Sequence, residues 1–548
     1  MWKPNVRSQD PRKWWHLAIT IAVVAAVLAA NLALMAFAAD RNLFIDTTRE
    51  GRYTVREQMF TFLREADMQD DVDIIFCADA DILHADYNAS LVYILALELE
   101  MKVPNIHVST VNVSRNPEAV EMYKRNAATV INWNDVIITS GTEYRVYGLN
   151  TFFTVDEKTN AVVGFNGERR MCEAILSMTA KSLPIACFTV GNGETLPRQD
   201  DEETGYLYDR IRDAGFLPMA IDLEREDIPA DCTLLIINGP TEDFSSGRIE
   251  DMDYNSPITK IDRFLDGYGT VYYFRDPAAG TLPNLEEFLR EWGVSFDVKD
   301  HAGNTFHNVT LQDTGAALSG DPNRISGSYT DASVYSEITA LSSPPKTIFE
   351  NCAPVNIVWQ DGYSAVNGAG RTAKALFTTT EKAYAVNAAG DTVAGGSFPL
   401  MTMTSETRIV DNDYFTATLF VCGTTAYHAA EYMADNVYAN GDVLQSTLRG
   451  AARTTVSVHD ELPFKFYEST AFTESYDEAE NTVYKRDEYG NAIWLTDPET
   501  GLSSPVILRT IRPMEKWELS VWMWVLIGLP ALVCFVTGSF VVLRRKNR

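Results

Sequence analysis

A buried strand that ends in a glycine-rich turn is predicted for residues 185–194, which have the sequence IACFTVGNGE. Two further apolar runs follow at 233–238 and 270–274, and helix-like segments at 203–214 and 258–266 separate the three runs. Strands that alternate with helices indicate a sheet built through crossover connections. We therefore expect a parallel-sheet α/β unit around this segment.

A second alternation of strands and helices precedes this unit. Residues 72–76 and 106–113 are strand-like and flank a helical segment at 88–101, and further strand-like segments lead to a helix at 168–181. The apolar residues of that last helix recur at the spacing of one helical face, at Met171, Ala174, Ile175 and Met178. The order resembles a thioredoxin-like βαβ–ββα unit. No CxxC redox motif accompanies it, so we expect only the architecture.

The composition changes between residues 301 and 394. Ser, Thr, Gly, Asp and Ala become frequent there, and the β-like runs are short. Regular patterns return after residue 395 and include a helical stretch at 441–452. We therefore expect a β-rich insertion within the second α/β unit.

The charge of the chain is unevenly distributed. It holds 46 Lys+Arg against 75 Asp+Glu in 548 residues, a formal charge of −29. A nucleic-acid binder needs a basic face that displaces counterions from phosphates, so this composition argues against that class. The tails 1–13 and 544–548 are basic, which leaves about −36 for the region between them.

Two uncharged runs, 14–39 and 519–543, are each long enough to cross ~30 Å of hydrocarbon as a helix. Basic residues lie on the terminal side of each run, as they do in the cytoplasmic segments of membrane proteins. The pattern predicts a two-pass plasma-membrane protein with both termini cytoplasmic and the main domain extracytoplasmic. The alternative for the first run is a cleaved signal peptide, because residues 36–38 (AFA) supply small residues near its end.

Together these patterns predict an α/β extracytoplasmic region held between two transmembrane helices. This region consists of a thioredoxin-like unit plus a second parallel-sheet α/β unit with a β-rich insertion. The expected segments are a cytoplasmic tail (1–13), a transmembrane helix (14–39), the thioredoxin-like domain (47–183), the second α/β domain (184–300 and 395–465), the insertion (301–394), a membrane-proximal segment (466–518), a second transmembrane helix (519–543) and a cytoplasmic tail (544–548).

Motifs that carry chemistry are not found in the sequence. It contains neither a GxxxxGK[ST] phosphate loop nor a GxSxG nucleophile elbow. The seven cysteines form no CxxC pair, and the seven histidines show no HExxH spacing. We therefore expect a protein that is not an enzyme and has no cofactor and no metal site.

The sharpest candidate for ligand or partner contact is the turn of Gly191, Asn192, Gly193 and Glu194. It follows a strand of an α/β unit, and the carboxyl ends of such strands line ligand crevices. The glycines let backbone N–H groups approach a ligand, and the Glu194 carboxylate accepts hydrogen bonds. The alternative is a tight turn whose glycines only satisfy positive φ angles.

Six segments, in their order along the chain, carry a resemblance to a known family. They are NPE at 116–118, GFNGE at 164–168, GNGE at 191–194, LLIINGP at 234–240, DRFLDGYG at 262–269 and LPNLEEFLREWG at 282–293. Together they resemble the Gldg family, the gliding-motility-type auxiliary subunits of ABC transporters. The resemblance covers about 50–300 well, 395–460 loosely and 301–394 hardly. Asn192 stands where that family carries a histidine, so any role of the histidine is not expected here.

The resemblance implies a non-catalytic, membrane-anchored auxiliary subunit of an ABC transport system. Its partners would be separate ABC permease and ATPase subunits, together with the lipid bilayer that its two helices enter. Its large extracytoplasmic region would bind a substrate or a partner. The alternative is an independent cell-envelope binding or adhesion protein that uses the insertion at 301–394.

Overall fold

The computed structural model describes two compact units, one of residues 48–471 and one of residues 1–47 and 472–548. The described residues are 11–40, 51–452 with short gaps, and six strand segments beyond 452. The gaps are at 52, 67, 69, 157–161, 181–182, 247–254, 331–335, 340–343, 367–368, 411–412 and 435–436, and the later segments are 465–466, 475–477, 482–484, 494–496, 503–505 and 507–508.

The unit that contains both chain ends holds one long helix and several short strands. Helix α1 covers Pro11–Asp40. The strands are β26 (Ser475–Asp477), β27 (Thr482–Tyr484), β28 (Trp494–Thr496), β29 (Ser503–Pro505) and β30 (Ile507–Leu508). They form a sheet in the order β26-β27-β30 and a separate β28-β29 pair. Only these strands are described within the predicted membrane-proximal segment beyond residue 466.

The predicted membrane topology is contradicted. Within the described part of the chain, no helix combines the length and the apolar character that a membrane crossing requires. The expectations of two transmembrane helices and of a two-pass location with an extracytoplasmic main domain are corrected accordingly. The second predicted run, 519–543, and the tail 544–548 lie outside the described residues.

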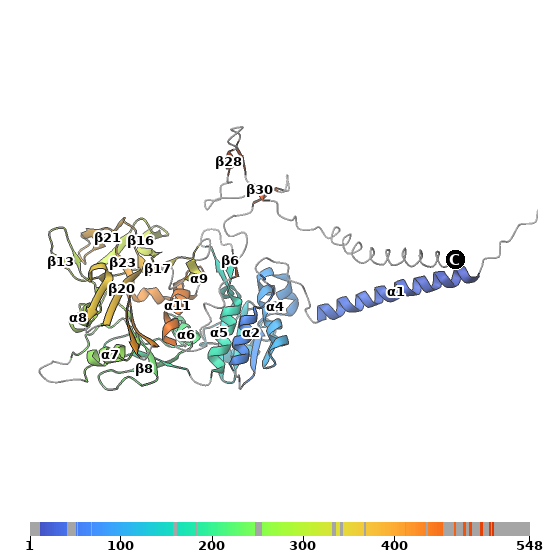
Figure 1. Ribbon diagram of the computed structural model, residues 1–548, viewed down its shortest axis with the longest axis horizontal. Helices are drawn as coiled ribbons and strands as arrows, with labels where there is room; N and C mark the ends of the chain where they lie inside the picture. Colours follow the sequence, from blue (N-terminus) through green and yellow to red (C-terminus); the bar gives the residue numbers. More distant parts are fainter. Residues whose placement is uncertain are drawn as a thin grey trace, which may run out of the picture. The chain divides into compact units, whose positions relative to one another are not determined.

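The larger unit is a mixed α/β structure with two lobes (Figure 1). The amino lobe, residues 51–180, contains a four-stranded sheet in the order β2-β1-β3-β4. Strand β1 (Val72–Phe76) is parallel to β2 (Ile106–Thr110) and antiparallel to β3 (Asp135–Ser140), which forms a hairpin with β4 (Glu143–Gly148). Strand β4 is therefore an edge of this sheet.

Helices cover one face of the amino-lobe sheet. The core contains side chains of β1 and β3 packed against α2 (Glu57–Glu65), α4 (Tyr87–Lys102) and α5 (Gly167–Thr179). Helix α4 begins at a side-chain cap, because the Asp86 carboxylate accepts a hydrogen bond from the Ala89 amide at 2.8 Å. The shorter elements of the lobe are α3 (Ala80–Ala85), η1 (Pro117–Tyr123), η2 (Leu149–Phe152), β5 (Phe153–Val155) and β6 (Val162–Phe165).

The carboxyl lobe, residues 183–452, is built on an 11-stranded sheet with a parallel half. Strand β7 (Ile185–Thr189) is parallel to both β8 (Leu217–Ile221) and β9 (Cys232–Asn238). Strand β10 (Thr270–Phe274) is parallel to β9 and to β24 (Asp413–Cys422). Every residue of β10 is buried, as expected for a strand that has packed layers on both faces.

Four helices form the two layers over the parallel strands. Side chains of α6 (Gly205–Asp213) and α11 (Asn440–Ala452) join the core on one face of the sheet. Side chains of α7 (Pro257–Asp266) and α8 (Pro283–Glu291) join the core on the other face. The Ser256 hydroxyl caps α7 by accepting a hydrogen bond from the Thr259 amide, and a proline follows at the first helical position.

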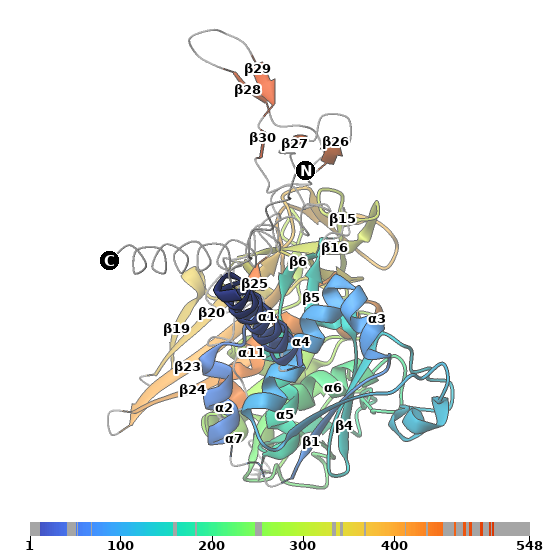
Figure 2. The ribbon, with the colours of Figure 1, turned by 90° about the vertical axis from the view of Figure 1, so that its right-hand side faces the viewer.

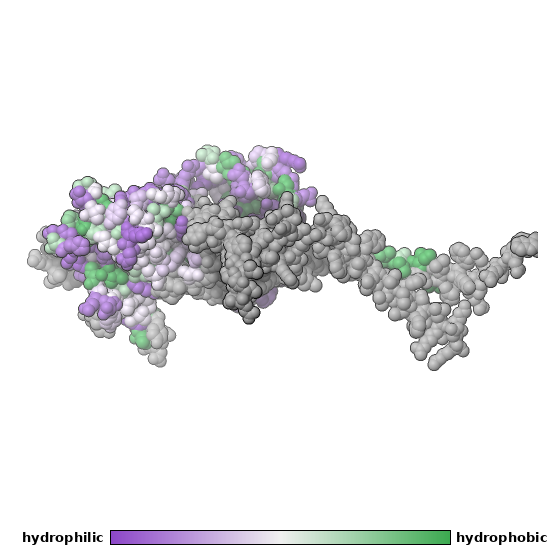
Figure 3. Space-filling model, turned by 90° about the horizontal axis from the view of Figure 1, so that it is seen from above, coloured by the Kyte–Doolittle hydropathy of each residue, from purple (hydrophilic) through white to green (hydrophobic). Residues whose placement is uncertain are grey.

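The same sheet continues into the region predicted as an insertion. Strand β23 (Pro399–Val410) is antiparallel to β24, and β20 (Ala369–Thr378) and β16 (Asp321–Tyr329) add to it in turn. Main-chain hydrogen bonds therefore join strands on both sides of residue 394, where the insertion was expected to end. In the space-filling view, hydrophilic and hydrophobic side chains are interspersed over the visible described surface of this lobe (Figure 3).

Shorter elements complete the carboxyl lobe. The strands are β11 (Val294–Ser295), β12 (Val298–Lys299), β13 (Thr305–Phe306), β14 (Thr310–Asp313), β15 (Ala317–Leu318), β17 (Thr347–Glu350), β18 (Asn356–Ile357), β19 (Tyr363–Val366), β21 (Ala383–Val386) and β22 (Thr392–Gly395). The helices are α9 (Ser336–Thr339), η4 (Gln360–Gly362), η5 (Thr425–His428) and α10 (Ala430–Ala434).

Helix α5 joins the two lobes and lies beside α6 (Figure 2). Its apolar side chains enter the core of the amino lobe, whereas Arg169 and Arg170 reach the carboxyl lobe. Both arginines bind Oδ1 of Asp442 in the first turn of α11, at 3.2 and 2.8 Å. Because both guanidiniums are almost completely buried, this carboxylate offsets the free-energy cost of their desolvation.

A second buried ion pair holds the two ends of the larger unit together. Strand β25 (Lys465–Phe466) pairs with β6 of the amino lobe. The Lys465 ammonium lies 2.9 Å from the Glu168 carboxylate and donates to the carbonyl oxygens of Gly51 and Thr54 at 2.7 and 2.5 Å. The Arg56 amide also donates to Glu168, at 2.7 Å. Gly51 and Thr54, near one end of this unit, therefore lie beside Lys465, near the other end.

Replacing Asp442 by asparagine tests the junction between the lobes. We expect Asp442→Asn to lower the free energy of unfolding by about 3–5 kcal/mol, because it leaves buried guanidiniums without their shared anion. Urea unfolding followed by circular dichroism measures the loss. The matched control is Asp200→Asn, which removes an exposed carboxylate paired with Arg198 and should change stability by less than ~1 kcal/mol. Equal losses in the two variants would contradict the assignment.

Candidate functional site

The predicted turn at 191–194 lies at the point where the sheet changes its winding direction. Strand β7 stands between β8 and β9, and the crossover helices α6 and α7 lie on opposite faces. The loops after β7 and β9 therefore leave the sheet side by side at its carboxyl edge. In open α/β sheets this topological switch point is the usual place for a ligand crevice.

Hydrogen bonds join these two loops directly. The carbonyl oxygen of Asn192 accepts from the amides of Thr241 and Glu242, each at 2.9 Å. The Asn192 side-chain amide donates to the Asp243 carbonyl at 2.9 Å, and Asn192 is only 7% exposed. Most polar groups of Asn192 are thus engaged within the protein, which favours the alternative of a structural turn.

Glu194 retains one oxygen for further contact. Its Oε2 accepts a hydrogen bond from the Asn192 amide at 2.6 Å. Its Oε1 is buried and has no hydrogen-bond partner in the described structure. The structure thus brings Gly191, Asn192, Gly193 and Glu194 together at the switch point, and a role in ligand or partner contact stays a prediction.

A buried histidine beside the end of β9 is neutral. His428 follows β24 and its Nε2 lies 2.7 Å from Oδ1 of Asn238, at the end of β9. Burial lowers the pKa of His428 to about 4, so the ring carries no charge at neutral pH. The group orients the Asn238 side chain, which also donates to the Thr195 carbonyl at 2.8 Å.

The backbone conformation of the turn predicts a specific sensitivity at Gly193. Its φ is +80°, and an added Cβ would collide with Oγ1 of Thr241. We expect Gly193→Ala to lower the free energy of unfolding by about 3 kcal/mol, from backbone strain and overpacking together. The control is Gly303→Ala, which has φ of +87° and open space around the new methyl group. It should cost about 1 kcal/mol from strain alone. Thermal unfolding of both variants measures the difference, and an equal loss would show that the Thr241 contact is unimportant.

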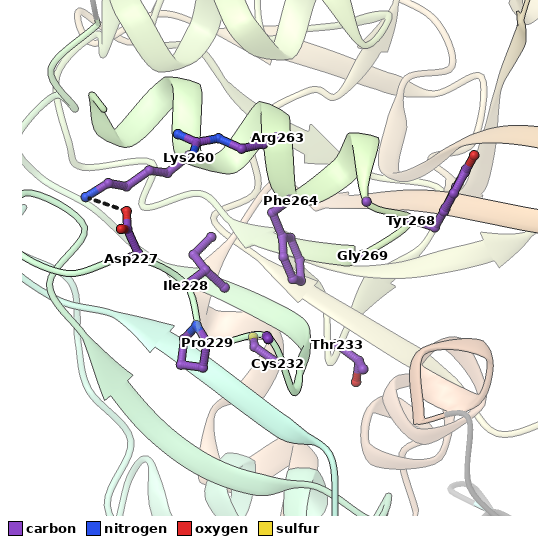
Figure 4. Close-up of a pocket in the computed structure, with 12 residues that line it drawn as sticks. Asp227, Ile228, Pro229, Cys232, Thr233, Lys260, Arg263, Phe264, Tyr268 and Gly269 are labelled. Atoms are coloured by element: carbon purple, nitrogen blue, oxygen red, sulfur yellow. Dashed lines mark ion pairs between the residues drawn. The ribbon is translucent and has the colours of Figure 1, made fainter. Parts of the chain in front are cut away.

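A pocket of about 400 Å³ lies at the opposite, amino edge of the sheet (Figure 4). It is formed between the end of α7 and the segment before β9, with Phe264 and Ile228 facing each other. The Lys260 ammonium donates to the carbonyls of Leu223 and Glu226, each at 2.8 Å, and lies 3.5 Å from the Asp227 carboxylate. Its three donors are therefore engaged within the protein, and the lysine stabilises the fold rather than presenting a binding group.

A second pocket, of about 330 Å³, lies between the two lobes and is called the interlobe pocket. Edge strand β4 contributes one wall, and helix α6 contributes the wall across from it. Its aromatic and charged lining consists of Tyr123, Arg125, Asp135, Tyr144, Arg145, Tyr147, Tyr206, Asp209, Arg210 and Asp213. A concave site between lobes with convergent polar groups is a typical location for a ligand.

The sequence of α6 contains a periodic pattern that indicates one wall of this pocket. Tyr206, Asp209, Arg210 and Asp213 recur at i, i+3, i+4 and i+7, so they share one face of the helix. Leu207 and Ile211 occupy the other face and enter the sheet core. A helix with one apolar face and one charged, aromatic face predicts a second packed surface.

Two ion pairs line the interlobe pocket. Nε of Arg145 donates to Oδ1 of Asp213 at 3.0 Å, and the Tyr147 hydroxyl donates to the same oxygen at 3.1 Å. Arg125 forms the second pair with Asp209, and its guanidinium lies over the Tyr206 ring at 5.0 Å from the ring centre. Each pair links a residue of the amino lobe to α6.

Burial shifts the pKa values of several groups in the pocket. It raises the pKa of Asp209 to about 6, although the guanidinium of Arg125 acts in the opposite direction. It also raises the pKa of Asp135 and lowers the pKa of Arg210. Groups with shifted pKa values inside a cleft are characteristic of functional sites.

Behind the pocket, the junction between the lobes contains a carboxyl group that stays protonated. Burial raises the pKa of Glu173 to about 8, despite the nearby guanidiniums of Arg169 and Arg170. Burial would also raise the pKa of Asp442, but the guanidiniums of Arg170, Arg169 and Arg210 lower it overall. Near neutral pH, three arginines therefore face one ionised carboxylate and one mainly protonated carboxyl group.

The protonated state of Glu173 predicts how stability depends on pH. The folded state holds a proton at Glu173 that the unfolded state loses above its ordinary pKa of 4.5. Stability should therefore fall as the pH rises from about 4.5 to 8, with a contribution of up to ~1.4 kcal/mol per pH unit from this group. Glu173→Gln should remove that contribution, whereas the exposed Glu224→Gln should not. Urea unfolding at pH 5, 6, 7 and 8 measures both, and a wild-type curve parallel to that of Glu173→Gln would contradict the expectation.

Metal and thiol chemistry gains no support from the described residues. They contain no group of three or more His, Cys, Asp or Glu side chains that is arranged to hold a metal ion. The six described cysteines are all buried and unpaired. Burial raises the pKa of Cys352 and Cys172 well above the ordinary value, so these thiols stay protonated.

Comparisons with known proteins leave the family open. No family model matches the chain, and no curated protein matches it. Among solved structures, the "mmIFT52 N-terminal domain" aligns at 13% identity over 49% of this chain and 98% of its own, with a TM-score of 0.33. A likeness at that score carries no argument about fold or function. The resemblance to the Gldg family therefore stays a prediction from the sequence.

Proposed function

We propose that this protein is a non-catalytic auxiliary subunit of an ABC transport system, and that it binds a ligand in the interlobe pocket. The pocket is the observation that carries the binding part of the proposal. It lies between two α/β lobes and is lined by paired and unpaired charges and by four tyrosines. The transport part rests on the order of the sequence segments that resemble the Gldg family.

The way the two lobes are joined supports a binding role for the cleft. The Arg145–Asp213 and Arg125–Asp209 pairs each cross between the lobes at the pocket wall. The Asp442 carboxylate, bound by Arg169 and Arg170, holds α5 against α11. A ligand that contacted both walls would therefore shift the equilibrium between different arrangements of the two lobes. A partner subunit can recognise such a shift.

Purification of the full chain at its natural expression level tests the transport part. We expect an affinity-tagged chain, solubilised gently and isolated from its own cells, to carry an ABC permease and an ABC ATPase with it. Quantitative mass spectrometry against an untagged strain measures the enrichment of both. Recovery of the chain without either subunit would contradict the proposal.

A pocket variant supplies the control for that purification. Tyr206→Ala removes an aromatic side chain from the pocket wall while leaving both interlobe ion pairs in place. It should impair transport but still recover the permease and the ATPase, because it changes the binding site and not the exterior of the unit. Loss of both subunits in this variant would mean that the pocket itself is the partner contact.

A further inference from the structure

We infer that the interlobe pocket takes a small organic anion, with a carboxylate or phosphate group bound by Arg210 and Arg125 and the rest of the molecule packed on the tyrosines. The inference deepens the proposed function, because it assigns the chemical class of the ligand. It is tested on the purified chain without partner subunits, so its failure and the failure of the transport proposal are distinguishable.

Arg210 is the first observation that points to an anion. Among the described residues its guanidinium makes one hydrogen bond, from Nη2 to the Met433 carbonyl at 3.3 Å, and no ion pair. It also lies against the amino end of α11, because a Cβ on Gly441 would stand 2.8 Å from its Nε. A guanidinium has five N–H donors, so most of the donors of Arg210 remain free at the wall of the pocket.

The position of Arg210 beside the start of α11 raises the free energy of its charged form. The amino end of a helix carries partial positive charge, and Arg170 adds a full one nearby. Asp442, a carboxylate whose charge acts on Arg210, is already bound by Arg169 and Arg170. An anion in the pocket would supply the missing negative charge.

Arg125 contributes a second set of donors. Its Nη2 pairs with Asp209, whereas its Nη1 is buried and has no hydrogen-bond partner in the described structure. Two guanidiniums with free donors suit an oxyanion, since carboxylate and phosphate oxygens accept several charge-assisted hydrogen bonds at once.

The tyrosines define the other half of the ligand. Tyr123 and Tyr144 lie edge to face with ring centres 5.5 Å apart, and Tyr147 and Tyr206 complete the aromatic lining. Tyrosine rings offer large, rigid apolar surfaces, so the body of the ligand is expected to be flat or apolar. A volume of about 330 Å³ limits it to a small molecule.

The carboxylates of the pocket give the inference a pH signature. Asp209 faces Arg125 and Arg145 of the amino lobe and Arg210 and Asp213 of its own helix. Its pKa of about 6 means that it loses its charge on acidification and then competes less for Arg125. Asp135, which also lines the pocket, has a raised pKa and acts in the same direction. Anion binding should therefore strengthen as the pH falls from 7.5 to 5.5.

Calorimetric titration of the full-length protein with benzoate, phenyl phosphate and neutral benzamide tests the inference. We expect at least one of the two anions to bind at least ten-fold more tightly than benzamide. The tighter of the two anions shows whether the natural ligand carries a carboxylate or a phosphate. Equal affinity for all three probes, or binding of none, would overturn the inference.

Two substitutions in the pocket should change the affinity for anions in opposite directions. Arg210→Gln should weaken anion binding at least ten-fold, whereas the exposed Arg198→Gln should not change it. Asp209→Asn removes the competing carboxylate, so it should strengthen anion binding at pH 7.5 and flatten the dependence on pH. A gain of affinity cannot arise from misfolding, so the second variant keeps the test decisive if Arg210→Gln is unstable. Unchanged affinity in Asp209→Asn would contradict the assignment.

Discussion

The shared carboxylate of Asp442 is the interaction on which the arrangement of the two lobes depends. Helix α5 is buried along nearly its whole length, so its charged residues have no access to water. Burial of Arg169 and Arg170 is tolerable only with a nearby anion, and that anion comes from the first turn of α11 in the other lobe. The position of α11 in turn places Gly441 against Arg210. The charge that holds the lobes together thus also shapes the wall of the interlobe pocket.

Part of the fold was predictable because it follows from local patterns. The apolar runs at 72–76 and 270–274 coincide with β1 and β10, and the helical stretch expected at 441–452 differs from α11 by one residue. Strand β20 was harder to predict, because its sequence, AGRTAKALFT, lacks a continuous apolar run and its pairing with β23 supplies the regularity. Hydrogen bonds between distant strands leave no mark in a short window of sequence. The uncharged run 14–39 coincides with α1 to within three residues, yet the membrane crossing predicted from it is contradicted, because no described helix is long and apolar enough to span a membrane.

The two candidate sites also differ in how far the sequence could predict them. The turn at 191–194 was found from glycines after a strand, and its place at the switch point follows from the sheet order. The interlobe pocket was missed because its walls, β4 and α6, are far apart in sequence. Sequence patterns identify functional side chains that lie within one segment of the chain. A site formed by two lobes requires the tertiary structure, although the charged and aromatic face of α6 was already visible in the sequence.

The ion pair of Lys465 with Glu168, together with the hydrogen bonds from Lys465 to the carbonyls of Gly51 and Thr54, has a mechanical consequence. Tension applied through the chain at the two ends of the larger unit would be borne first by this ion pair and by the pairing of β25 with β6. The hydrophobic cores of the two lobes would carry load only after these contacts gave way. Within the larger unit, these contacts therefore shield the interlobe pocket from tension applied at Gly51 and Lys465.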